Sequence, residues 1–107
     1  MIPEVDSLNQ SVFRLSDRAY IERFIDGALV VNLEENRLIE LNPTADEVLS
    51  LTDGKRTLEE VAVDVAQTHE IPLEDALEDI KDLCRQLHSW KILEEVPIRS
   101  NGSEKER

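Results

Sequence analysis

Residues 38–60 constrain the fold of this 107-residue chain most strongly, because a strand end and two helix starts follow one another there. The stretch opens on an apolar run that stops at Asn42, and Pro43 follows directly. Asn is a favoured N-cap residue, and Pro suits the first helical position because an N–H there would have no partner within the helix. The pattern therefore predicts a strand that leads directly into a helix.

The same stretch predicts where this helix ends and where the next one begins. Asp53 and Gly54 interrupt the apolar pattern, and Gly can supply the positive φ that helix C-termini often need. Thr57, with Glu60 three positions later, matches the T-x-x-E capping box, in which hydroxyl and carboxylate each accept a bond from a first-turn amide. Residues 38–60 thus predict a strand followed by a helix–turn–helix, and they contain no catalytic motif.

The preceding residues carry β-strand signals. Apolar residues dominate from Tyr20 to Leu41, with interruptions at Asp26-Gly27 and at residues 34–36. Asp-Gly is a strong hairpin signal, because a type I′ turn needs positive φ at its central residues. We therefore expect an antiparallel meander with strands over residues 20–25, 28–33 and 37–41.

Alternation assigns faces to the last two of these strands. In the second strand every other residue is apolar and shares a face: Leu29, Val31 and Leu33. In the third strand Ile39 and Leu41 point one way, and Leu38 and Glu40 point the other way. We expect Leu38 on the face opposite the core, or at the margin of the core.

Helical spacing of apolar residues follows the capping box. We expect a helix over residues 57–68 and a longer one over residues 72–90. The apolar stripe of the longer helix is Leu73, Ala76, Leu77, Ile80, Leu83, Cys84, Leu87 and Trp90. The predicted fold class is α+β and winged-helix-like, with a three-stranded N-terminal meander followed by a three-helix bundle (β-β-β-α-α-α).

A chain of this length is expected to form a single domain. We place the folded domain at residues 18–96 and a polar, disordered tail at residues 97–107. Residues 1–17 are predicted to be a flexible arm, or one exchanged with a second copy, because they hold several apolar residues without a sustained period. Short extended segments are expected around Val12 and Phe13 and, near the other end of the chain, at Ile92 and Leu93.

Composition excludes several classes of partner. The net charge of −12 disfavours nucleic-acid phosphates and anionic membrane surfaces, which attract clustered Lys and Arg. The sequence shows neither a membrane-spanning run nor an export signal. The one cysteine cannot form an internal disulfide, so a reducing, cytoplasmic location is expected.

Catalytic chemistry is not predicted either. His69 and His88 lack partners at metal-ligand spacing, and Cys84 lies in an apolar stripe, where it is expected to be a buried hydrophobe. No cofactor or metal motif is present. The start of the longest predicted helix carries Glu74, Asp75, Glu78 and Asp79, which would repel DNA phosphates. The chain is therefore expected to be a binding protein and not an enzyme.

The third predicted strand is an outer strand of the meander, so one of its edges has unpaired N–H and C=O groups. If the longest helix lies beside this edge, the two form a groove suited to β-strand addition by a peptide. The alternative is that the N-terminal arm or a second copy covers the edge, and the residues alone do not separate these two hypotheses.

Several motifs together resemble the PqqD family of peptide chaperones, whose domain is also called the RiPP recognition element. They are Leu41-Asn42-Pro43-Thr44-Ala45, Asp53-Gly54, Thr57 and Glu59-Glu60, and the similarity extends over about residues 20–95. The chain departs from the family where members often have Gly before the last apolar pair, since Ser89-Trp90-Lys91 stands there. The exit from the longest helix is therefore expected to differ.

The resemblance implies a protein that holds the leader segment of a ribosomally made precursor peptide and presents it to a modifying enzyme. The implied partner is a radical SAM enzyme or a leader peptidase, and no cofactor is implied. The expected peptide-binding residues are Arg37, Leu38, Ile39, Glu40, Leu41, Ile80, Leu83, Cys84 and Leu87. The alternatives are a homodimeric interaction protein without peptide cargo and a regulatory domain for another enzyme.

Overall fold

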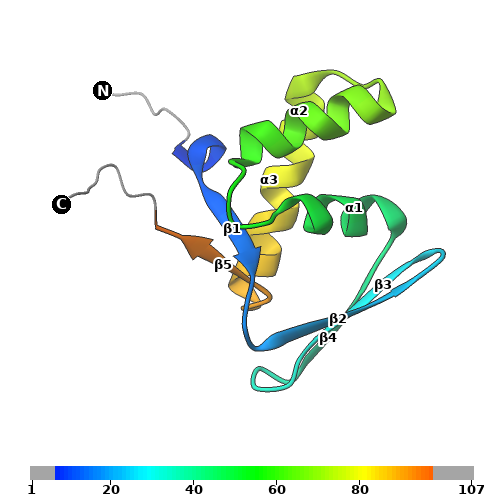
Figure 1. Ribbon diagram of the computed structural model, residues 1–107, viewed down its shortest axis with the longest axis vertical. Coiled ribbons are helices and arrows are strands. Elements are labelled where there is room, and N and C mark those ends of the chain that lie inside the picture. Colours follow the sequence, from blue (N-terminus) through cyan, green and yellow to red (C-terminus); the bar gives the residue numbers. More distant parts are fainter. Residues whose placement is uncertain (1–6, 98–107) are drawn as a thin grey trace.

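The computed structural model describes residues 7–97, which form two small sheets and a group of helices (Figure 1). The expected tail at 97–107 lies outside the described residues except for Pro97, as do the first six residues of the expected arm. The elements are, in order, a 3-10 helix η1 (Ser7–Gln10), β1 (Val12–Leu15), β2 (Ala19–Phe24), β3 (Gly27–Asn32), β4 (Arg37–Leu41), α1 (Pro43–Leu51), α2 (Leu58–His69), α3 (Leu73–Ser89) and β5 (Leu93–Val96).

Strands β2, β3 and β4 form the predicted antiparallel meander, in that order. The first turn differs from the expected one: Phe24 pairs with Gly27, so the two turn residues are Ile25 and Asp26 and not Asp26 and Gly27. Gly27 is required for a different reason. Its φ is +144°, and a Cβ there would lie 2.2 Å from the carbonyl oxygen of Leu41, so the close approach of β4 excludes a side chain.

The predicted helix caps are confirmed. Asn42 Oδ1 accepts a 2.8 Å bond from the N–H of Ala45. Thr57 and Glu60 form the reciprocal capping box at the start of α2. Gly54 has the expected positive φ of +83°, but it lies beyond the cap residue Thr52 and donates its N–H to the carbonyl of Phe13 at 2.9 Å.

One face of the meander and the three helices enclose the core. On the inward face of β3, Ala28, Val30 and Asn32 are buried, and α1 packs over them. The largest fully buried side chains are those of Phe13, Leu58, Leu87, Ile92, Leu93, Val30, Val61, Asn32 and Cys84. Leu38 is 66% exposed, which confirms its expected place on the face opposite the core.

The structure differs from the expected N-terminal arm, because residues 7–16 belong to the folded unit. Strand β1 pairs antiparallel with β5 of the same chain, and Val12 faces Val96 in this register. Phe13 is 2% exposed, in edge-to-face contact with His88 at 5.4 Å between ring centroids. The sequence pattern did not reveal this second sheet because its two short strands are separated by almost the whole chain.

In the connection from α3 to β5, one residue adopts a backbone conformation that is unfavourable for a residue with a Cβ. Lys91 has a φ of +62°, in the left-handed region. The N–H of Ile92 donates to the carbonyl of Leu87, and that of Lys91 donates to His88. These two bonds are the Schellman pattern, in which Gly is the usual residue at the position of Lys91. The chain thus forms this turn with Lys at the position where Gly is usual.

Lys91→Gly is therefore expected to stabilise the fold by about 1 kcal/mol, because it removes the steric cost of a Cβ in the left-handed region. Urea unfolding followed by circular dichroism would measure the change. Ser89→Gly is the matched control, since Ser89 lies within α3 and Gly there should destabilise by about 0.5–1 kcal/mol. Equal destabilisation by both variants would contradict the strain at Lys91.

Candidate functional site

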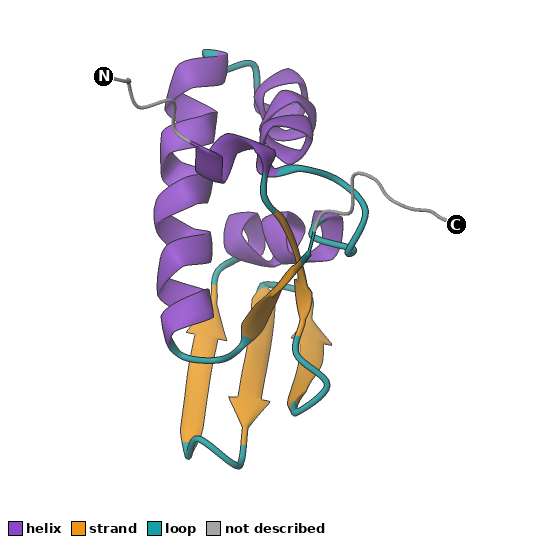
Figure 2. Ribbon diagram, turned by 90° about the vertical axis from the view of Figure 1, so that its left-hand side faces the viewer, coloured by secondary structure: helices purple, strands orange, loops and turns teal. Residues whose placement is uncertain are grey.

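Strand β4 lies at one edge of the meander, and among the described residues it pairs only with β3. Figure 2 shows the strand that leads into α1 at the edge of the sheet nearest to α3. The opposite edge, β2, carries Arg23, whose guanidinium bonds Asp46 and Ser50 of α1. Both outer strands of the meander have an unpaired edge, and the edge of β4 is the one nearest to α3.

The hairpin fixes which backbone groups of β4 point toward that open edge. The pair Phe24 and Gly27 closes a two-residue turn, so it must be a hydrogen-bonded pair, and hydrogen-bonded pairs then alternate along the ladder. Carried through the register of β3 and β4, this alternation directs Arg37, Ile39 and Leu41 toward β3. The N–H and C=O groups of Leu38 and Glu40 consequently face outward, where another strand can pair with them.

Helix α3 forms the second wall and runs antiparallel to β4. At the start of β4, the Arg37 guanidinium stacks on the ring of Trp90, 5.2 Å from its centroid. At the other end, Leu83 and Asp79 share a hollow with Asn42. Residues 79, 83, 86 and 90 have the spacing of one helix face, which places Gln86 between the two contacts. The wall is thus acidic and apolar at one end and aromatic at the other.

This hollow, here called the end pocket, has a volume of about 200 Å³ and lies among α1, α2 and α3. Its lining is mainly apolar, with Ala45, Val48, Val65, Ile71, Ile80 and Leu83 among its residues. His69, also part of the lining, bonds Glu47 across the two helices at 2.7 Å. The end pocket is large enough for one apolar side chain, and it includes Asn42, the residue directly after β4.

The residues expected to bind peptide occupy different environments. Arg37, Leu38 and Glu40 are exposed, and Ile39 is half-buried. On α3, Leu83 is half-buried and Ile80 is buried, and both line the end pocket. The remaining three are core residues: Leu41, Cys84 and Leu87. Cys84 and Leu87 support the helix wall from inside and have almost no surface for a ligand.

Cys84 is predicted to be chemically inert in the folded protein. Burial raises the pKa of its thiol to about 12, because the thiolate loses its hydration, and the side chain is fully buried. At about pH 8 we expect no alkylation by iodoacetamide under native conditions and complete alkylation in urea, measured by mass spectrometry. Rapid modification of the native protein would contradict this prediction.

Sequence reasoning missed part of the candidate groove. Trp90 was assigned to the apolar stripe and Asp79 to the acidic start of the helix, although the spacing of 79, 83, 86 and 90 could have united them. No local signal identified the contributions of α1 and α2 to the end pocket. These contributions depend on how three helices meet.

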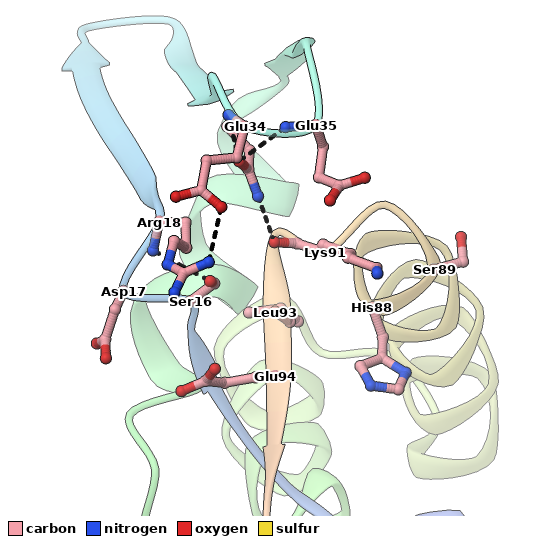
Figure 3. A pocket seen from close by; sticks show the side chains of 11 residues that line it. Ser16, Asp17, Arg18, Glu34, Glu35, His88, Ser89, Lys91, Leu93 and Glu94 are labelled. Atoms are coloured by element: carbon pink, nitrogen blue, oxygen red, sulfur yellow. Dashed lines mark hydrogen bonds and ion pairs between the residues drawn. The ribbon is translucent and has the colours of Figure 1, made fainter.

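A larger, open hollow of about 590 Å³ lies at the C-terminal end of α3 (Figure 3). Charged groups of both signs line it, and Arg18 is paired with Glu34 at 2.6 Å. Asn32 donates to the carbonyl of Lys91 at 2.8 Å and accepts bonds from the N–H groups of Glu34 and Glu35. Asn32 therefore joins the meander to the exit of α3, and the hollow has no charge of one sign that would select a ligand.

Residues 7–97, the described part of the chain, hold neither a metal-binding cluster nor a membrane-spanning helix. In this range no group of three or more His, Cys, Asp and Glu side chains is arranged to hold a metal ion. None of the helices within it is both long enough and apolar enough to cross a membrane. The open edge of β4 near α3 is the candidate site in the described part of the chain.

The family of the chain follows from a profile comparison. Residues 27–93 match the family described as Coenzyme PQQ synthesis protein D (PqqD), and this is well over half of the 107 residues. The chain belongs to the PqqD family. The match confirms the resemblance deduced from the motifs, and it includes β3, β4 and all three helices of this PqqD-family protein. No curated protein matches it significantly.

Solved structures share the fold. TbiB1 in complex with the TbiA(beta) leader peptide has a TM-score of 0.70 and 18% identity, over 76% of this chain and 94% of TbiB1. Lasso peptide synthetase B1 complexed with the leader peptide has a TM-score of 0.69 and 21% identity, over 77% and 96% of the chains. The PqqD truncation of Methylobacterium extorquens PqqCD, a stand-alone RiPP recognition element, has a TM-score of 0.66 and 25% identity, over 78% and 88%.

Proposed function

We propose that this PqqD-family protein binds the leader segment of a ribosomally made precursor peptide by β-strand addition to β4. The observation that carries the proposal is the open edge of β4, where the backbone groups of Leu38 and Glu40 point outward from the sheet and α3 lies nearby. Family membership supports it, as does the likeness to proteins whose structures contain a leader peptide.

The geometry supplies both affinity and selectivity. Pairing with β4 gives main-chain hydrogen bonds that any peptide sequence can make, each worth about 0.5–1.5 kcal/mol net. Side chains at alternate positions of the added strand would then meet α3, where the end pocket accepts an apolar group and Trp90 offers a ring. The proposed role is to hold the peptide and present it to an enzyme.

The chemistry of the partner enzyme is proposed from the family. A radical SAM enzyme or a leader peptidase would receive the core of the peptide while the leader stays in the groove. A homodimer joined through the edges of β4 is the second candidate, because the same open edge could pair with its own copy. Repulsion between two chains of net charge −12 disfavours this dimer relative to peptide capture.

Titration of the ¹⁵N-labelled protein with synthetic leader peptides of precursor genes from the same genome tests the proposal. We expect amide shifts at residues 37–41, at Leu83, Gln86 and Trp90, and around the end pocket. Sedimentation at the same concentrations separates peptide binding from a β4-mediated dimer. Absence of binding at about millimolar peptide, which corresponds to about −4 kcal/mol, would overturn the proposal.

A further inference from the structure

The outward face of the meander carries an apolar patch that the proposed leader groove does not use. Figure 1 shows the meander nearly edge-on, with α1 on one side and no described element on the other. On the uncovered side, Tyr20, Val31 and Leu38 stand directly opposite one another across the three strands. Tyr20 and Leu38 are each 66% exposed. Contiguous exposed apolar residues with a polar rim are typical of protein contact sites.

The next row on this face has a different character. Glu22, Leu29 and Glu40 are opposite one another, so two exposed carboxylates flank an apolar residue. Beyond this row, Phe24 and Asp26 line a hollow with Glu40. A ring beside two carboxylates suits the side chain of Lys or Arg, which gains both an ion pair and a cation–π contact. The face therefore combines an apolar centre with an acidic border.

These charges and the size of the face argue against a second copy as its occupant. Two copies packed face to face with their Glu22 and Glu40 rows in register would bring these carboxylates together, and buried like charges are costly. Three strands of about five residues cover a projected area of only about 240 Å², so the face alone is smaller than a standard interface, which buries about 800 Å² of accessible surface on each partner. The face is better suited to be the centre of a larger contact with a different protein.

The position of the face relates it to the bound peptide. A strand paired with β4 would become the fourth strand of the sheet, and every second side chain of this strand would lie on the same face as Leu38. A protein docked on Tyr20, Val31 and Leu38 would consequently touch the peptide as well. This continuity rests on the proposed function.

We propose that the outward face of the meander docks the enzyme that acts on the bound peptide, through an enzyme surface with apolar residues bordered by Lys and Arg. The leader then binds the edge of β4 while the enzyme binds the adjoining face, and the added strand lies between them. The sheet thereby brings the peptide to the enzyme without covering the peptide's outward side.

The test titrates the 107-residue chain with a purified peptide-modifying enzyme from the same genome. Tyr20→Glu should weaken enzyme binding by about tenfold or more, as expected at an interface centre, and leave leader affinity unchanged. Tyr20 is two strands from the groove, so the two readouts are separate. Val63→Glu is the matched control, because Val63 is an exposed apolar residue on α2, and it should change neither affinity.

Charge gives an independent readout. Glu22→Lys should also weaken enzyme binding, and raising the salt from about 50 mM to about 300 mM should weaken binding of the unmodified chain. Circular dichroism confirms that each variant is folded. Unchanged enzyme affinity in both Tyr20→Glu and Glu22→Lys would overturn the proposal, as would a dimer of the free chain that Tyr20→Glu abolishes. Enzyme docking at this face without leader binding would refute the proposed function and leave the docking face standing.

Discussion

Leu38→Pro is expected to weaken leader binding by about ten- to a hundredfold, equivalent to about 1.4–2.8 kcal/mol. Pro removes the N–H that Leu38 presents at the open edge, and its ring occupies the space where a peptide strand would approach. The side chain of Leu38 is largely exposed, so the core is unaffected, and an edge strand tolerates Pro at an outward-facing N–H. Calorimetric titration with the leader would measure the loss.

Two variants at neighbouring positions make this expectation specific to the backbone. Leu38→Ala keeps the N–H, so it should bind the leader nearly as well as the unmodified protein. Ile39→Pro removes a donor that faces β3 and should cost about 3 kcal/mol of folding stability. Full leader affinity in folded Leu38→Pro would show that the peptide does not pair with β4.

Phe13→Ala is expected to lower the free energy of unfolding by about 3–5 kcal/mol. Phe13 is almost fully buried and contacts His88, so its removal leaves a cavity between β1 and the end of α3. A loss of this size is a large part of the total stability of a small domain, which is about 5–15 kcal/mol. Urea unfolding measured on both proteins would give the difference.

The adjacent residue provides the control. Arg14 is exposed and pairs with Glu94 at 2.6 Å, and Arg14→Ala should cost less than about 1 kcal/mol because solvent screens such a pair. A loss below about 1 kcal/mol for Phe13→Ala would mean that β1 is not packed against the core in solution. If β1 were exchanged between copies instead, the stability of the unmodified protein would rise with protein concentration.

The helix caps and the two faces of β4 could be predicted from the sequence, and there is a physical explanation for this. Where β4 leads into α1, the Asn42 side chain accepts a hydrogen bond from the amide three residues later. At the start of α2, the side chains of Thr57 and Glu60 each accept a bond from the other's backbone amide. Such bonds depend on local backbone geometry, so residue type and spacing suffice to predict them. The alternation of Leu38 and Ile39 was likewise enough to assign the faces of the strand.

The groove required more than local rules. Leu83 and Trp90 were recognisable as members of one apolar stripe, but only the packing of α3 shows that they lie along β4 while Cys84 and Leu87 turn into the core. When the apolar stripe of a helix is wide, the residues at its centre are buried in the core and the residues at its margins stay partly exposed. The sequence pattern gives the same hydrophobic signal for both.

By itself, the sequence determined the succession of strands and helices from β2 to α3, the caps between them and the family to which the chain belongs. The tertiary structure alone decided that β1 pairs with β5, which brings Val12 beside Val96, and that three helices close the end pocket. The physical reason is the range of the interactions. Caps and turns satisfy hydrogen bonds within a few residues, whereas pairing across the whole chain depends on buried area and loop closure, which leave no local pattern.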